Sequence, residues 1–309
     1  MKYLIVSHKN CPDGFGASWA AHRKLEQPEN EVQYIYIEPS KWDLVKGSRN
    51  IDKIFFFDVV PDPNMILATI AVEGTDMPSI EIWDHHISNK KQYDDVDFGE
   101  HDVKVHFDME HSGAWLAWNR LSDEIGVPAP KLIQYVQDRD LWKWELPNSR
   151  AISAYIASHT RTFGRWDTIH EILEGTDKVA QASLIAAGDG ILRYQEQLID
   201  ICVKTMYSDI IIDELFGGHT VGVANCSTVT LVSEVAGSIA KEKDIGLCWF
   251  VDNGPKGVII KVSLRSRGEG PDVSVLAKKY GGGGHKNAAG FSLDPKSDLA
   301  AHITRIIQE

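Results

Sequence analysis

The sequence predicts an α/β protein: an N-terminal domain with a parallel sheet, a helical linker and a smaller C-terminal domain of mixed α/β type. Over roughly the first 185 residues, short apolar segments alternate with helical patterns. These segments are continuously apolar, as in parallel strands that helices cover on both faces. Beyond residue 209 the pattern changes to hairpins. We therefore expect domains at 1–185 and 209–309, with a linker helix at 186–208.

The N-terminal elements follow from this alternation in chain order. Strands are predicted at Tyr3–Val6, Val32–Ile37, Ile54–Val59, Ser79–Trp83 and Val103–Phe107. Helical spacing of apolar residues predicts helices at Gly14–Leu25 and Asn64–Val72, and then a helical region at Ser112–Ile125, Ala129–Asp138, Arg150–Ser158, Trp166–Leu173 and Lys178–Tyr207.

Glycine-containing turns define the C-terminal elements. Strands Asp209–Leu215 and His219–Ala224 are predicted on either side of Phe216-Gly217-Gly218. A second hairpin is predicted from Gly246–Val251 and Gly257–Leu264, which flank a turn that begins at Asp252.

The composition is that of a globular protein: of 309 residues, 43% are hydrophobic and 25% are charged. No apolar stretch approaches the ~20 residues of a membrane span, and the apolar N-terminus is too short for a signal peptide. We therefore expect a cytoplasmic protein. The four cysteines have no C-x-x-C spacing, which argues against a zinc ribbon or a disulfide framework.

The net charge of -12 disfavours long duplex nucleic acid as a ligand. Proteins that follow a duplex usually carry a basic stripe, because neutralising phosphates supplies much of their affinity. The sequence shows no such stripe. A small phosphorylated substrate held by a few local cations is compatible with the charge.

Potential metal ligands follow three of the predicted strands. His8 follows the first, Asp58 ends the third, and Asp84-His85-His86 follows Trp83. Ligands bind beyond the carboxyl ends of the strands in parallel sheets, so these side chains are expected to form one site. Carboxylates and imidazoles are common ligands of divalent ions.

Two further acidic positions have competing interpretations. Asp13 suits metal binding in the turn before Gly14, or it caps the following helix. Asp138 and Asp140 end an apolar helix, and by themselves they indicate a solvated helix end. For Asp58, which follows three phenylalanines, metal binding is favoured over a turn role, because burial of an unpaired carboxylate is costly.

A glycine-rich segment in the C-terminal domain predicts an anion site. The four glycines Gly281–Gly284 precede His285 and Lys286, and backbone N–H groups in such a segment can approach a phosphate closely. Upstream, strand alternation places Arg265 and Arg267 on the same face. Paired guanidinium groups suit a phosphate or carboxylate.

Together, these motifs resemble the DHH phosphoesterase superfamily with its DHH-associated C-terminal domain. The resemblance covers nearly the whole chain, and the motifs occur in the family's order. It implies a catalytic domain that binds two divalent ions, usually Mn²⁺, and a substrate-binding domain across an active-site cleft. Members include RecJ-type exonucleases, nanoRNases and other oligoribonucleases, and phosphodiesterases of cyclic nucleotides.

The resemblance also implies roles for individual residues. The metal ligands would be His8, Asp13, Asp58, His85 and Asp138, with Asp140 as the alternative to Asp138. Asp58 would bridge the two ions, Asp84 would orient His85, and His86 would face the scissile phosphate. The substrate's far phosphate or nucleotide would be held by Arg265, Arg267, Gly283, Gly284 and His285.

Cys11 departs from the family pattern. It occupies the place of the first of two carboxylates, the second being Asp13. A thiolate favours softer ions, so Zn²⁺ or Fe²⁺ compete with Mn²⁺, Mg²⁺ and Co²⁺ at this site. Weak binding of a single ion, or replacement of the ligand by Asn10 or water, are the alternatives.

The expected function is metal-dependent hydrolysis of short oligonucleotides or dinucleotides, linear or cyclic, to mononucleotides by a metal-activated water. Two alternatives remain. One is a hydrolase of pyrophosphate or nucleotide phosphomonoesters, and the other is a catalytically weak nucleotide-binding member. Trp142 and Trp144 are candidates for base stacking. The oligomeric state is open, a homodimer being one option.

Overall fold

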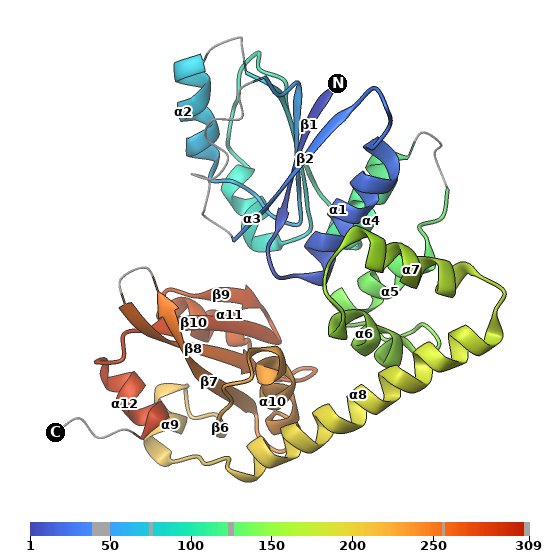
Figure 1. Cartoon of the computed structure of the whole chain (residues 1–309). Coiled ribbons are helices and arrows are strands. Elements are labelled where there is room, and N and C mark those ends of the chain that lie inside the picture. Colours follow the sequence, from blue (N-terminus) through green and yellow to red (C-terminus); the bar gives the residue numbers. More distant parts are fainter. Residues whose placement is uncertain (39–49, 74–76, 123–126, 255–256, 306–309) are drawn as a thin grey trace. The chain divides into compact units, whose positions relative to one another are not determined.

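The computed structural model describes residues 1–38, 50–73, 77–122, 127–254 and 257–305. The chain divides into two compact units, Met1–Leu192 and Arg193–Glu309, with the boundary inside the long helix α8 (Lys178–Lys204) (Figure 1). The end of the predicted helix Ser112–Ile125 and part of the turn that begins at Asp252 lie outside the described residues.

The first unit contains a five-stranded sheet in the order β2-β1-β3-β4-β5, in which all neighbours are parallel. Its strands are β1 (Lys2–His8), β2 (Glu31–Ile37), β3 (Lys53–Phe57), β4 (Ser79–Asp84) and β5 (Val103–Phe107). Each predicted N-terminal strand is present, which confirms the predicted parallel sheet. Because β1, β3 and β4 are neighbours, their carboxyl ends lie side by side.

Helices cover both faces of this sheet, as the apolar strands require. The helices α1 (Pro12–Leu25) and α4 (Gly113–Leu121) cover one face, where Ile5 and Phe55 belong to the core (Figure 1). The helices α2 (Pro63–Glu73) and α3 (Ile87–Tyr93) cover the other, where Leu4 and Phe56 are buried. The helix α3 was not predicted from the sequence.

A helical region completes the first unit. It comprises α5 (Lys131–Asp140), α6 (Ser149–Ser158), α7 (Phe163–Glu174) and the first part of α8. Their apolar faces form one core with α1, in which Trp19 and Trp166 are fully buried. The helices at these positions agree with the predicted ones. This core fixes the end of α5 relative to the sheet.

The second unit is built around a mixed sheet in the order β6-β7-β8-β10-β9. The strands are β6 (Val221–Asn225), β7 (Ile245–Gly254), β8 (Gly257–Arg265), β9 (Gly283–His285) and β10 (Ala288–Leu293). Only β6 and β7 pair in parallel; the other described pairs are antiparallel. The antiparallel pairing of β7 with β8 confirms the second predicted hairpin.

Helices pack on both faces of the second sheet. The helix α10 (Val232–Ile239), which follows the 3₁₀ turn Val229–Leu231, packs with α8 on one face. The other face is covered by α9 (Ile210–Leu215), α11 (Val273–Lys279) and α12 (Asp298–Thr304).

The prediction of a strand at Asp209–Leu215 was wrong, because this segment forms helix α9. Asp209 caps the helix: its carboxylate accepts a hydrogen bond from the backbone N–H of Ile212 at 2.9 Å. Ile212 and Phe216, four residues apart, are both fully buried. The segment therefore follows helical periodicity, which a short apolar run does not distinguish from a strand.

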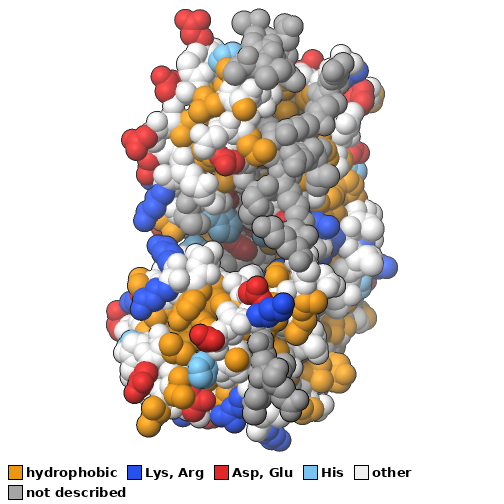
Figure 2. Space-filling view, turned by 90° about the vertical axis from the view of Figure 1, so that its left-hand side faces the viewer, with side chains coloured by type: hydrophobic (Ala, Val, Ile, Leu, Met, Phe, Trp, Pro, Cys, Tyr) orange, Lys and Arg blue, Asp and Glu red, His pale blue; other side chains and the backbone are white. Residues whose placement is uncertain are grey.

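The surface carries charges of both signs. On the face shown in Figure 2, the Lys and Arg side chains of the described residues are scattered among acidic and apolar ones and form no continuous band. Of the helices in the described part of the chain, none is long and apolar enough to cross a membrane.

Candidate metal centre

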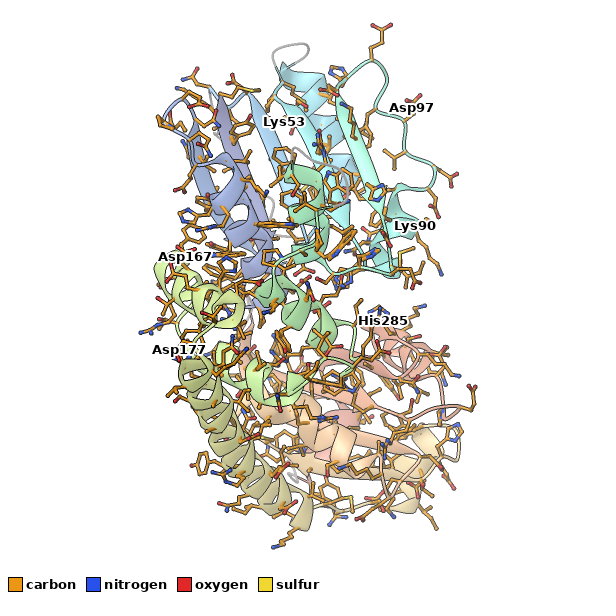
Figure 3. All side chains as sticks on the ribbon, turned by 90° about the vertical axis from the view of Figure 1, so that its right-hand side faces the viewer. Lys53, Lys90, Asp97, Asp167, Asp177 and His285 are labelled. Carbon is orange, nitrogen blue, oxygen red and sulfur yellow. The ribbon has the colours of Figure 1, made fainter. Side chains whose placement is uncertain are left out.

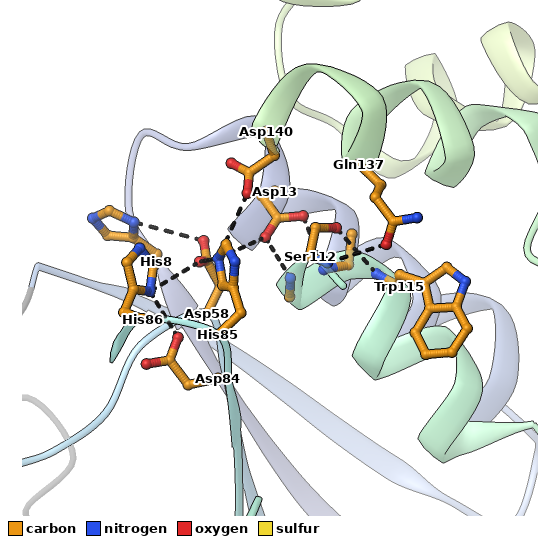
Figure 4. A network of polar contacts seen from close by, with 12 residues as sticks. His8, Asp13, Asp58, Asp84, His85, His86, Ser112, Trp115, Gln137 and Asp140 are labelled. Carbon is orange, nitrogen blue, oxygen red and sulfur yellow. Dashed lines mark hydrogen bonds and ion pairs between the residues drawn. The ribbon is translucent and has the colours of Figure 1, made fainter. Parts of the chain in front are cut away.

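The carboxyl ends of β1, β3 and β4 bring the predicted ligands together (Figure 4). His8 is the last residue of β1, Asp58 follows β3, and His85 follows β4. Asp58 has a positive φ of 59°, an uncommon conformation for a residue other than glycine. Such backbone strain is often found at functional sites.

His85 lies at the middle of three carboxylates. Its Nε2 atom is 3.2 Å from Asp58 Oδ1, 3.5 Å from Asp140 Oδ2 and 3.7 Å from Asp13 Oδ2. Asp13 and Asp58 are 1% and 3% exposed. Because the buried carboxylates of Asp13 and Asp58 lie close to the third, Asp140, they need a neighbouring positive charge. In this structure the imidazole of His85 faces all three.

The other oxygen of Asp58 faces a second set of ligands. Asp58 Oδ2 lies 3.6 Å from His8 Nδ1, and among the described residues this buried oxygen has no hydrogen-bond partner. Ligand atoms of His8, Cys11 and Asp58 lie within 4.8 Å of one another, as do those of Asp13, His85 and Asp140. A buried carboxylate oxygen without a hydrogen bond suits coordination of a cation.

The N-terminus of α4 holds Asp13 in place. The carboxylate accepts hydrogen bonds from the backbone N–H groups of Gly113 at 2.6 Å and Ala114 at 2.9 Å. These donors belong to α4, so Asp13 does not serve as the cap of its own helix, which was the alternative interpretation. Gly113 has no space for a side chain, since a Cβ atom there would lie 2.5 Å from Asp58 Cβ.

Asp84 positions His86, not His85 as the resemblance implied. Asp84 Oδ1 lies 2.8 Å from His86 Nδ1, and Asp84 Oδ2 accepts a hydrogen bond from Asn89 Nδ2 at 2.7 Å. The backbone at His86 is extended, so residues 84 and 86 share one side of the chain. Asp84 is fully buried, whereas the His86 side chain is 33% exposed.

The structure places Asp140, and not Asp138, beside His85. Asp138 turns into the loop after α5, where it accepts hydrogen bonds from the backbone N–H of Glu145 and from the hydroxyl of Ser149. Asp138 thus organises the loop that carries Trp142 and Trp144. The expectation for Asp138 is therefore corrected in favour of Asp140, its alternative.

The pKa values of the clustered carboxyl and imidazole groups are shifted by burial and by one another's charges. Burial and the charges of Asp140 and Asp58 raise the pKa of Asp13 well above its usual value, and burial beside Asp58 raises the pKa of Asp140 to about 6. Burial alone would lower the pKa of His85, but Asp58 and the neighbouring carboxylates raise it to about 10. The cluster therefore retains a proton on His85 at neutral pH, where a divalent ion would compete for the same carboxylates.

The pKa of the Asp58 carboxyl is lowered, in contrast to that of Asp13 and Asp140. Burial acts to raise its pKa, but the imidazoles of His8 and His85 outweigh burial and lower it. Asp58 is therefore ionised at neutral pH and faces both ligand groups. The donor set of imidazole, carboxylate and thiol fits divalent transition metals.

The comparisons with known proteins agree with this fold. Residues 224–309 match the model of the DHHA1 domain. The structure of RecJ from Thermus thermophilus in complex with Mn²⁺ has a TM-score of 0.53 at 14% identity, covering 99% of this chain and 52% of RecJ. A structure of exonuclease RecJ bound to manganese has a TM-score of 0.51 at 15% identity, covering 99% of this chain and 91% of the other.

Residues 224–309 form a DHHA1 domain, and the fold of the chain is similar to that of RecJ. A relative in Acanthamoeba polyphaga mimivirus, the uncharacterized protein R106, is 23% identical over 308 residues, which cover 94% of this chain and 67% of that protein. The C-terminal part of the resemblance seen in the sequence motifs, the DHH-associated domain, is thus confirmed at residues 224–309.

Within the DHHA1 domain, the two arginines differ in setting. Arg265 ends β8 and is partly buried; its guanidinium donates to Ser233 Oγ at 2.7 Å and to the backbone carbonyl of Leu264 at 2.8 Å. Arg267 lies beyond the end of β8 and is exposed. Strand β8 ends at Arg265, so strand alternation does not extend to Arg267, and their pairing on one face stays a prediction.

The glycine-rich segment of the DHHA1 domain is partly a strand rather than a loop. Gly283, Gly284 and His285 form β9, which pairs with β10, and His285 is labelled in Figure 3. Gly284 has a φ of 138°, and a Cβ atom there would lie 2.4 Å from the Ala288 carbonyl oxygen. Close backbone packing therefore explains the glycine at position 284. Strand β9 lies at the edge of the sheet.

Sequence reasoning missed two groups that hold the centre. The first is the N-terminus of α4, for which Ser112-Gly113 before an apolar helical pattern was an available signal, since Ser112 caps α4. The second is Asn89, which lies on the unpredicted helix α3 and gave no signal.

Proposed function

We propose that this protein is a metal-dependent phosphodiesterase that hydrolyses dinucleotides or short oligonucleotides to mononucleotides. The observation that carries the proposal is Asp58, a buried carboxylate with one oxygen toward His85 and the other toward His8. A carboxylate with ligand groups on both sides suits a pair of divalent ions.

His8, Cys11 and Asp58 would hold one ion, and Asp13, His85 and Asp140 would hold the other, with Asp58 between them. Divalent ions bound in this way polarise a phosphoryl oxygen and lower the pKa of a water nucleophile. Mn²⁺ is the first candidate, because it is present in both RecJ structures. The hydrolysis forms a bond from a water oxygen to phosphorus and breaks the ester P–O bond, and the departing oxygen takes up a proton.

His86 would stabilise the phosphate during this reaction. Burial acts to lower its pKa, but Asp84 outweighs burial and raises it, which favours the imidazolium. With Nδ1 oriented by Asp84, the His86 imidazolium would stabilise the negative charge on a phosphoryl oxygen. The partial exposure of His86 lets a ligand approach.

The DHHA1 domain would supply phosphate or nucleotide recognition. Arg265 is held in place by Ser233 and Ser263, and Arg267 and His285 are exposed. We assign these three residues, with Gly283 and Gly284, to substrate binding. The net charge of -12 and the scattered cations favour a short substrate over a long duplex.

A substrate panel tests the proposal. Linear and cyclic dinucleotides, a longer single strand, a duplex, pyrophosphate and a nucleotide bisphosphate are assayed with Mn²⁺, Mg²⁺, Zn²⁺ and Co²⁺. We expect turnover of a dinucleotide and a loss of about 100-fold in His86→Gln, the scale of one lost charge-stabilising donor. The variant Asp97→Asn changes a carboxylate that caps a turn between α3 and β5 and is expected to retain full activity (Figure 3).

Other outcomes decide against the proposal. Faster turnover of pyrophosphate than of any dinucleotide would establish a small-phosphate hydrolase instead. Nucleotide binding with no turnover under any metal would establish a binding protein.

A further inference from the structure

Cys11 lies where the chain turns from β1 into α1, at the residue before the helix begins. Helix capping does not account for a cysteine here, because Ser, Thr, Asp and Asn are the residues preferred at this position. Asn10, the preceding residue, has a positive φ of 59°, and Pro12 follows. The backbone on both sides of Cys11 is thus constrained.

The Cys11 side chain belongs to the ligand group that contains His8 and Asp58. The three ligand atoms lie within 4.8 Å of one another, a separation that one ion can span. Asp58 provides independent evidence that an ion binds to this group. Asp58 is 3% exposed, and its Oδ2 atom, 3.6 Å from His8 Nδ1, has no hydrogen-bond partner among the described residues.

The other ligand group has a different chemistry. Asp13, His85 and Asp140 offer only oxygen and nitrogen, with no sulfur. Hard and borderline ions such as Mn²⁺ and Mg²⁺ suit such a set, whereas thiolates select softer ions such as Zn²⁺. The two groups share one edge of the sheet and differ in the ions that they favour.

We propose that Cys11 is a thiolate ligand and that the centre holds two unlike positions. The His8–Cys11–Asp58 position is selective for a thiophilic divalent ion, Zn²⁺, Fe²⁺ or Co²⁺, and the Asp13–His85–Asp140 position accepts Mn²⁺. On binding, the Cys11 thiol loses its proton to solvent and the sulfur donates an electron pair to the ion. This inference rests on the proposed function, because it concerns the metal site on which that function depends.

Cobalt spectroscopy tests the proposal without an activity assay. The full chain is freed of metal with a chelator, kept reduced with a phosphine, and titrated with Co²⁺. We expect a thiolate-to-cobalt charge-transfer band in the near ultraviolet, together with the visible bands of bound Co²⁺. The band is expected to vanish in Cys11→Ser and Cys11→Asp, and to remain in the matched control Cys202→Ser, whose cysteine lies on α8.

A competition experiment adds a second readout. In Cys11→Asp, which places a carboxylate at this position, the preference for Zn²⁺ over Mn²⁺ is expected to fall roughly tenfold or more. Visible cobalt bands without a charge-transfer band in the native protein would overturn the role of Cys11 and leave the proposed function standing. No cobalt binding at all would overturn both.

Discussion

The imidazole Nε2 of His85 lies 3.2 Å from a carboxylate oxygen of Asp58, although the two residues are 27 positions apart in the chain. The contact exists because β3 and β4 are adjacent parallel strands that end at the same edge of the sheet. Both residues follow the last residue of their strand. The strand order thus converts two distant motifs into one centre.

Removal of the Asp58 charge is expected to abolish the centre. Asp58 belongs to the His8–Cys11–Asp58 group and lies 3.2 Å from His85 of the other group, so Asp58→Asn removes the charged carboxylate that faces both. We expect metal content to fall below one ion per chain and turnover to fall by more than about 100-fold. Elemental analysis and dinucleotide hydrolysis measure this, and Asp97→Asn serves as the control. Two bound ions in Asp58→Asn would contradict the assignment.

Gly113→Ala, at the N-terminus of α4, is expected to displace the carboxylates of the same centre. The added Cβ would lie 2.5 Å from Asp58 Cβ and 2.9 Å from Asp13 Oδ2, so a carboxylate must move. We expect metal affinity to fall about 10- to 100-fold, as when outer partners of ligands are lost. The control is Gly164→Ala on α7, where a Cβ meets nothing within 4 Å. Calorimetric titration with Mn²⁺ compares the two, and equal affinities would refute the packing argument.

Asp84→Asn is expected to affect catalysis more than metal binding. Asp84 contacts His86 and Asn89, and the change removes the charge that favours the imidazolium. We expect kcat to fall roughly 10- to 100-fold with little change in KM, because the donor to the phosphate loses its orientation. The upper pH limit of activity should also fall. An unchanged pH profile would show that Asp84 has only a structural role.

Metal binding is expected to strengthen as the pH rises. In the metal-free protein the pKa of His85 is about 10 and that of Asp140 about 6, so protons must leave both groups when an ion binds. Affinity should therefore increase from about pH 5 toward pH 10, with proton release near pH 7 from His85 and, where an ion takes the sulfur ligand, from the Cys11 thiol. Titration calorimetry in buffers of different ionisation enthalpy measures the released protons. An affinity that is independent of pH over this range would rule out His85 as a ligand.

The buried Glu81 is expected to control stability rather than activity. It accepts hydrogen bonds from Arg120 Nε at 2.6 Å and Nη2 at 2.7 Å, and it also binds Lys53. In Arg120→Met, only Lys53 among the described residues remains to neutralise the negative charge of this carboxylate, which is 1% exposed. We therefore expect the free energy of unfolding to fall by about 3 kcal/mol. Chemical denaturation measures this loss, with Lys104→Met, a change of an exposed side chain on β5, as the control. Equal losses in both variants would contradict the expectation.

The same carboxyl predicts acid sensitivity. Burial acts to raise the pKa of Glu81, but Arg120 and Lys53 outweigh burial and lower it to about 2. A folded-state pKa below the unfolded value gives stability that is present above about pH 4.5 and is lost as the pH falls toward 2. In Glu81→Gln this part of the pH dependence should disappear, which thermal unfolding at several pH values can measure.

Much of the fold was predictable because the strands of the first sheet are continuously apolar and their ends carry unusual residues. Phe55 to Phe57 followed by Asp58 defines both a buried strand and a candidate ligand. The pairing of Asp84 with His86 was also available, since residues two apart in an extended segment share a side. The segment Asp209–Leu215 was not predictable in this way, because a short apolar run fits a strand as well as a helix.

The sequence by itself determined the ligand types, their positions at strand ends and the order of the motifs. Only the tertiary structure decided that Asp140 and not Asp138 faces His85, and that the N-terminus of α4 holds Asp13. Residues two apart on an α-helix point about 200° away from each other, so at most one of the two acids can face the sheet edge. The rotation of α5 about its axis selects Asp140, and the core formed with α1, α6 and α7 sets that rotation.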